Sequence, residues 1–130
     1  MPSARTQPVS GSKAAAISNM VVRLTSQYTG RGPTKARTYI NEDLVTVVLQ
    51  DTLTKAERTL VDHDRRELVL STRRAFQDAM EDDFVAGLRE ILGRDTVAFL
   101  SANHADPDYA VETFILVPQG AAADVPAIDP

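Results

Sequence analysis

The sequence predicts a single α/β domain (α+β) in which helices and β-hairpins follow one another in the order αββααββ. Two observations predict it. Segments with helical periodicity end twice at a Gly-Arg step, Gly30-Arg31 and Gly93-Arg94. After each step come two short runs rich in Val, Ile, Thr, Tyr and Phe, which is typical of a β-hairpin. We therefore expect two helix-hairpin units that form an antiparallel four-stranded sheet with the helices on one face.

Composition limits the classes of function. The chain has 130 residues, 43% hydrophobic and 25% charged, as expected for one soluble globular domain with its own core. Its net charge of -4 argues against nucleic-acid binding, because affinity for phosphates comes from a cationic surface. The lack of cysteine excludes thiol catalysis and fits a cytoplasmic protein. No apolar run approaches the roughly 20 residues that span a bilayer, so we expect no direct membrane insertion.

Low-complexity segments flank the predicted domain. Residues 1–11 are rich in Pro, Ser and Gly, and residues 118–130 are rich in Pro, Ala and Asp. Both compositions are typical of disordered tails. The single ordered domain is therefore expected over residues 12–117.

The first helix is predicted from an apolar stripe with the spacing i, i+3, i+4, i+7 and i+11. The stripe consists of Ile17, Met20, Val21, Leu24 and Tyr28. Ser12 is a suitable N-cap. Gly30 stands where a left-handed C-cap glycine belongs, and Pro33 prevents the helix from continuing.

A β-hairpin is predicted over residues 36–40 and 44–50, with Asn41-Glu42-Asp43 as its turn. Alternate residues of the second strand share one face, and this face is apolar: Val45, Val47 and Leu49. Val48 lies on the other face, which suggests that both faces of this strand are covered.

Two capping signals follow the hairpin. Thr54 and Glu57 have the spacing of a capping box, which predicts a short helix ending near Asp62. Asp64 and Glu67 have the same spacing and predict that a second helix starts there.

A long helix is predicted over residues 65–92, with Gly93 as its C-cap. Gly87 lies inside this helix, where Ala would have the better helix propensity. A continuous helix of this length would run about 40 Å, longer than a domain of this size is wide, and its continuity is left open. The second hairpin is predicted over 96–102 and 109–117. The apolar stripe of the long helix consists of Leu68, Phe76, Met80, Phe84, Leu88, Ile91 and Leu92.

Charges on the long helix are polarised, with arginines in its first half and acidic residues in its middle. A solvated face accounts for this pattern. A second hypothesis sets two such helices antiparallel across a twofold axis, because the apolar stripe is longer than its own sheet can cover. This hypothesis predicts a homodimer with the interface candidates Arg73, Arg74, Phe76, Met80, Glu81 and Phe84.

The segment Gly30-Arg31-Gly32-Pro33 invites comparison with a phosphate-binding loop. Such loops precede a helix, because free N–H groups and the dipole favour anions at the N-terminus. This segment follows a helix, so we interpret Gly30, Gly32, Pro33 and Gly93 as structural residues. Arg31 and Arg94 are the weak candidates for an anion contact. His63 and His104 lack metal-ligand spacing and no nucleophile motif appears, so no metal, cofactor or catalytic residue is predicted.

The sequence resembles the MpsC-like family of YbcI-related small bacterial proteins. The family is named for a system that translocates sodium or generates membrane potential and is linked to bicarbonate supply. The resemblance implies association with such a system, with a membrane protein as partner, and carries over no catalytic residue. It covers the whole predicted domain and rests on Tyr28-Thr29-Gly30-Arg31-Gly32-Pro33, Thr38-Tyr39-Ile40, Asp43, Leu53-Thr54, Ala56-Glu57, Arg73, Ile91-Leu92-Gly93 and Phe99-Leu100-Ser101.

From the resemblance we expect a soluble, non-catalytic accessory or regulatory protein of a bacterial sodium, membrane-potential or bicarbonate system. The alternative is a sensor that binds a small anion or a nucleotide near Arg31 and Arg94, and an enzyme is the third hypothesis. A pocket with converging ionisable groups would favour the enzyme. A flat apolar face without a pocket would favour the accessory protein.

Overall fold

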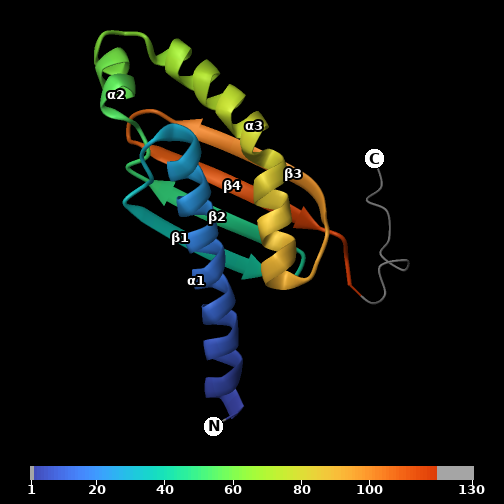
Figure 1. Ribbon diagram of the computed structural model, residues 1–130. Coiled ribbons are helices and arrows are strands. Elements are labelled where there is room, and N and C mark those ends of the chain that lie inside the picture. Colours follow the sequence, from blue (N-terminus) through green and yellow to red (C-terminus); the bar gives the residue numbers. More distant parts are fainter. Residues whose placement is uncertain (1, 120–130) are drawn as a thin grey trace, which may run out of the picture.

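The computed structural model describes residues 2–119, with side chains from residue 11 onward. The predicted order αββααββ is confirmed, and the four strands form one antiparallel sheet in the order β1-β2-β4-β3. Two of the helices, α1 and α3, pack on the same face of this sheet (Figure 1). The elements are α1 (Pro2–Thr29), β1 (Lys35–Asn41), β2 (Leu44–Gln50), α2 (Lys55–Asp62), α3 (Arg66–Leu92), β3 (Thr96–His104) and β4 (Tyr109–Leu116).

The hydrophobic core lies between the two long helices and the inner face of the sheet. Alternation along the strands supplies the sheet side of this core. Three phenylalanines link the layers, with ring centroids 5.8 Å apart for Phe84 and Phe99 and 5.0 Å apart for Phe99 and Phe114. The buried core residues are Ile17, Met20, Val21, Leu24, Val45, Val47, Leu49, Met80, Phe84, Leu88, Ala110, Phe114 and Leu116.

The first helix starts earlier than the sequence predicts. It begins at Pro2, so Ser12 lies inside it and the assignment of Ser12 as N-cap is wrong. The helix includes residues 2–11, for which a tail is predicted, while most of the other predicted tail, residues 120–130, lies outside the described residues. The domain limits at residues 12 and 117 stay predictions.

Both Gly-Arg steps end a helix with a glycine in the left-handed conformation. Gly30 has a φ of 81° and donates its N–H to the carbonyl of Ser26 at 2.8 Å. Gly93 has a φ of 68° and donates to the carbonyl of Arg89 at 2.7 Å. A side chain is strained at such φ values, which is the physical reason for glycine at both positions.

One of the two predicted capping boxes is present. The Thr54 hydroxyl accepts the N–H of Glu57 at 3.1 Å, and the Glu57 carboxylate accepts the N–H of Thr54 at 2.8 Å. At the second site the prediction is wrong, because Arg65 is the N-cap of α3 and makes no side-chain cap bond. Asp64 instead adopts a φ of 62°, which belongs to the turn between the two helices. From Arg66 onward α3 is one continuous helix of 27 residues.

Gly87 lies where α3 packs against α1, and the structure leaves no free space there for the side chain of Ala, in spite of its better helix propensity. A β-carbon at Gly87 would lie 2.8 Å from Cγ and 2.9 Å from Sδ of Met20, which is itself buried. We expect Gly87→Ala to destabilise the fold by about 1–2 kcal/mol, because overpacking outweighs the gain in helix propensity. Denaturant unfolding checks this, and an unchanged or higher midpoint would show that Met20 gives way freely.

The other face of the sheet, called the outer face below, is not covered by either of the two long helices (Figure 1). Val48 points to this face and is only half-buried. The interpretation that both faces of β2 are covered is therefore wrong for the single chain. Register defines the outer face as Lys35, Arg37, Tyr39, Asn41, Leu44, Thr46, Val48, Gln50, Ala98, Leu100, Ala102, His104, Tyr109, Val111, Thr113 and Ile115.

Candidate functional site

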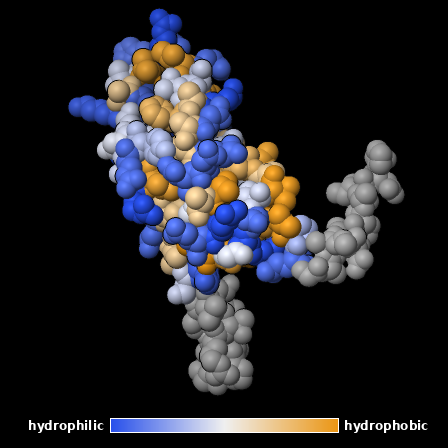
Figure 2. All heavy atoms as spheres, turned by 45° about the vertical axis from the view of Figure 1, so that its right-hand side comes forward, coloured by the Kyte–Doolittle hydropathy of each residue, from blue (hydrophilic) through white to orange (hydrophobic). Residues whose placement is uncertain are grey.

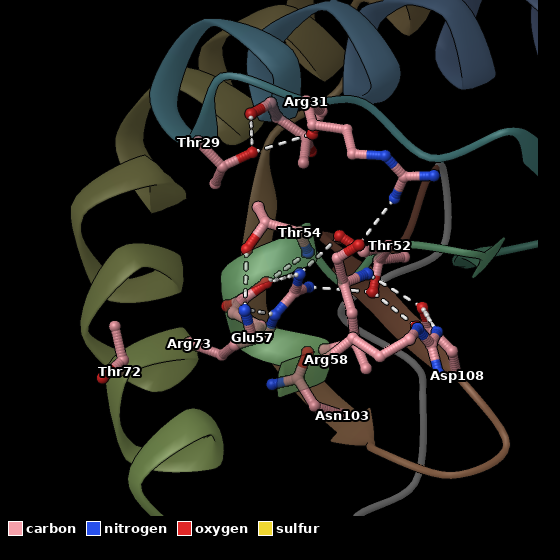
Figure 3. A network of polar contacts seen from close by, with 12 residues as sticks. Thr29, Arg31, Thr52, Thr54, Glu57, Arg58, Thr72, Arg73, Asn103 and Asp108 are labelled. Atoms are coloured by element: carbon pink, nitrogen blue, oxygen red, sulfur yellow. Dashed lines mark hydrogen bonds and ion pairs between the residues drawn. The ribbon is translucent and has the colours of Figure 1, made fainter. Parts of the chain in front are cut away.

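Polar side chains gather where the C-terminal end of α1 meets the β2–α2 loop and the first half of α3 (Figure 3). We call this group the polar cluster. It joins segments that are far apart in the sequence, so no short motif could reveal it. Its members are Arg31, Asp51, Thr52, Glu57, Arg58, Arg73 and Asp108.

Arg73 is the centre of the polar cluster and is only 8% exposed. Its guanidinium donates to both carboxylate oxygens of Glu57, at 3.1 and 2.8 Å, in the bidentate geometry that makes such pairs strong. It also donates to the hydroxyl of Thr52 at 2.9 Å and to its carbonyl at 2.5 Å. Burial alone would raise the pKa of Glu57, but the hydrogen bonds from Arg73 and Thr54 outweigh it and the pKa is lowered.

Asp108 ties the β3–β4 loop to this cluster. Its carboxylate accepts the hydroxyl of Thr52 and the N–H of Leu53, each at 2.8 Å. Arg58 donates to the same carboxylate at 3.3 Å. No local sequence pattern reveals these contacts, because the partners of Asp108 lie 50 to 56 positions away.

Arg31 holds the β2–α2 loop against the end of α1. Its Nη1 donates to the carbonyls of Asp51 and Leu53 at 2.8 and 2.7 Å, and its Nη2 donates to the Asp51 carboxylate at 2.9 Å. The pKa of Asp51 is lowered mainly by a hydrogen bond from Thr34 and next by the hydrogen bond from Arg31. The guanidinium is thus occupied by acceptors of its own chain.

We expect Arg31→Ala to lower the melting temperature by a few degrees and Arg31→Lys to recover only part of the loss. Lysine keeps the charge but loses the planar fork that serves three acceptors. Differential scanning calorimetry of the three proteins checks this. Equal melting temperatures together with a loss of stabilisation by phosphate would instead assign Arg31 to an anion site.

Arg94 makes hydrogen bonds of the same kind at the other end of β2. It donates to the carbonyls of Glu42 and Val117, at 3.0 and 2.9 Å, and to the carboxylate of Asp43. The structure therefore does not bring Arg31 and Arg94 together, because their partners lie at opposite ends of a strand. Each remains a separate candidate for an anion contact.

Glu112 is the ionisable group that sequence analysis missed. It lies on β4, faces the helices and is 2% exposed, with the Ser101 hydroxyl donating a hydrogen bond to it. Burial raises its pKa to about 7, against the opposing effects of the Ser101 hydrogen bond and the Arg73 charge. A signal was present, because strand alternation places Glu112 on the inner face with Ala110 and Phe114.

A small cavity connects Glu112 with the polar cluster. Its lining includes Thr25, Arg73 and Gln77. The volume open to a water-sized sphere is about 20 Å³, which is room for a single water molecule. The buried hydroxyl of Thr25 has no partner among the described residues, so it can bind such a water. The cavity has no room for a nucleotide.

The predicted interface residues on α3 fall into two groups. Met80 and Phe84 lie in the hydrophobic core, and Arg73 lies in the polar cluster. An interface on this helix would therefore rest on the exposed residues Arg74, Phe76 and Glu81.

The outer face of the sheet carries four of the nine large apolar side chains that are exposed among the described residues. Tyr39 and Leu100 are 53% and 57% exposed there, and Leu44 and Tyr109 are also exposed. Apolar side chains gather along the right-hand margin of Figure 2, on the sheet side, and at the upper end over α2 and the start of α3.

The family model described as MpsC, Na+-translocating membrane potential-generating system, matches residues 10–117. The chain belongs to the MpsC family. No curated protein and no solved structure matches it. Among the described residues, none of the helices combines the length and the apolarity that crossing a membrane requires.

The polar cluster of this MpsC-family chain joins separate segments through ion pairs. Its three carboxylates, those of Asp51, Glu57 and Asp108, each accept hydrogen bonds from arginine within the chain. Residues 2–119 also contain no group of three or more His, Asp or Glu side chains that could hold a metal. The cluster fixes how the β2–α2 loop, α2 and α3 sit on the end of the sheet.

Proposed function

We propose that this protein is a non-catalytic accessory or regulatory component of a bacterial system that translocates sodium, generates membrane potential or supplies bicarbonate. In this proposal it acts in the cytoplasm, through contact with other protein chains. The description of the MpsC family supports the association with such a system.

The observation that carries the non-catalytic role is a contrast between two surfaces. The charged groups of the polar cluster are bonded to one another, and the cavity beside them admits only one water. The outer face, in contrast, exposes one large apolar side chain on each of its four strands. Monomeric proteins rarely expose apolar patches of more than a few hundred Å², so the outer face supports a contact function.

Complementation of a strain that lacks the gene tests this proposal. We expect the wild-type chain to restore membrane potential, measured with a potential-sensitive dye. A charge on the outer face, Leu100→Glu, should abolish the restoration. The control Leu68→Glu makes the same change on α3 at a nearly equal exposure, 54% against 57%, and should restore it fully.

Three outcomes would contradict the proposal. Full restoration by Leu100→Glu would show that the outer face is not used. No effect of the gene on membrane potential, sodium tolerance or bicarbonate dependence would remove the association with the system. Strong thermal stabilisation by a nucleotide or an anion would favour the sensor instead.

A further inference from the structure

We propose that the outer face is a homodimer interface, in which a second copy of this chain packs its own outer face against the first. The inference rests on the proposed use of the outer face as a contact surface, and it identifies the binding partner as a second copy of the chain. In such a dimer the two sheets would lie face to face, about 10 Å apart, with the helices on the outside.

The area of the outer face is sufficient for a specific interface. Four strands spaced about 4.8 Å apart, with about eight residues at 3.4 Å each, cover roughly 500 Å². Two copies would therefore bury about 1,000 Å² even if both faces were smooth, and side-chain relief adds to this value. A specific interface needs about 1,000 Å² or more.

The distribution of charge favours a second copy over a partner that is recognised by charge. Only Lys35 and Arg37 among the outer-face residues are Lys, Arg, Asp or Glu, and both lie on the edge strand β1. The central strands β2 and β4 present Thr, Val, Leu, Ile, Gln and Tyr outward. Two such faces can meet without burying a charge, and the cations stay at the solvated rim.

The centre of the outer face suits sheet-on-sheet packing. Val48 and Val111 are direct neighbours across β2 and β4, and the next outward pair is Thr46 and Thr113. β-branched side chains make a pleated surface of even height, which packs against an equivalent surface. The half-buried state of Val48 and Val111 in the single chain leaves their outer surface available.

The competing interface is the exposed side of α3 that the sequence suggests. There the large apolar residues that remain exposed are Leu68 and Phe76. They stand among charged neighbours such as Glu67 and Arg74, and they are two exposed large apolar residues against four on the outer face. This interface is the alternative outcome of the experiment.

Sedimentation equilibrium of the purified full chain at micromolar concentration tests the proposal. We expect the wild type and Leu68→Glu to sediment at twice the monomer mass of 14.2 kDa. Leu100→Glu, at an exposed edge-strand position, and Val111→Glu, at the centre, should sediment as monomers with unchanged far-UV circular dichroism. Leu100 is largely exposed in the single chain, so Leu100→Glu should fold even if Val111→Glu does not.

A monomeric wild type would overturn the inference. A dimer that Leu68→Glu dissociates and Leu100→Glu leaves intact would also overturn it and would move the interface to α3. The proposed function can survive this result. If the wild type is monomeric and Leu100→Glu still fails in complementation, the outer face binds a different protein.

Discussion

Arg73→Met is expected to destabilise the fold by about 3–5 kcal/mol, the typical cost of removing one partner from a buried ion pair. The Glu57 carboxylate, with a side chain only 16% exposed, would lose its bidentate partner. The carbonyl of Thr52 would lose a donor at 2.5 Å. Because these bonds join α3 to α2 and to the β2–α2 loop, we expect the loss to appear in global unfolding.

Urea unfolding of matched variants measures this effect. Arg74→Met, at the exposed neighbouring position, removes the same charge and should change stability by less than about 0.5 kcal/mol. Adding Glu57→Gln to Arg73→Met should recover part of the loss, because the unpaired charge is then removed. Equal midpoints for Arg73→Met and Arg74→Met would show that the polar cluster does not hold the fold together.

The second large effect concerns Glu112, whose pKa is raised to about 7 by burial. The folded state binds this proton more tightly than the unfolded state, so wild-type stability should fall as pH rises from about 4.5 to 7 and somewhat beyond. The shift corresponds to about 3 kcal/mol at most. Glu112→Gln keeps a neutral side chain at all pH values, so its stability should lack this fall.

The informative quantity is the difference in unfolding free energy between the wild type and Glu112→Gln as a function of pH. Asp51 and Glu57 have lowered pKa values, so they contribute stability above their unfolded pKa values and lose it in more acidic solution. They are common to both proteins and cancel in the difference. If the stability curves of the wild type and Glu112→Gln run parallel from pH 4.5 to 8, the pKa of Glu112 is not raised by burial.

Structural features that depend only on residues close together in the sequence were predicted correctly. Gly30 and Gly93 end their helices, and Thr54 with Glu57 caps α2, because each needs only a few residues of local geometry. Asp64 shows the limit of this reasoning. Its capping-box spacing is correct, but the turn between the two helices places it at positive φ.

Long-range contacts account for what the sequence could not predict. Asp108 meets Thr52 across 56 positions, and Arg73 meets Thr52 across 21, so their roles follow from the fold rather than from spacing. Alternation groups Val48 with the outer face, but it does not tell which face the helices cover. Gly87 is another example, since its close approach to Met20 of α1 exists only in the folded chain.

Oxidative labelling of the three tyrosines of the unmodified chain tests most directly whether the outer face is the contact surface. Tyr39 and Tyr109 lie on the outer face, and Tyr28 on α1 is a control of similar exposure, at 36% against 40% for Tyr109. As the protein is concentrated from nanomolar to micromolar, we expect labelling of Tyr39 and Tyr109 to fall while Tyr28 stays unchanged. If the labelling of all three tyrosines stays constant over this concentration range, the chain does not self-associate through the outer face.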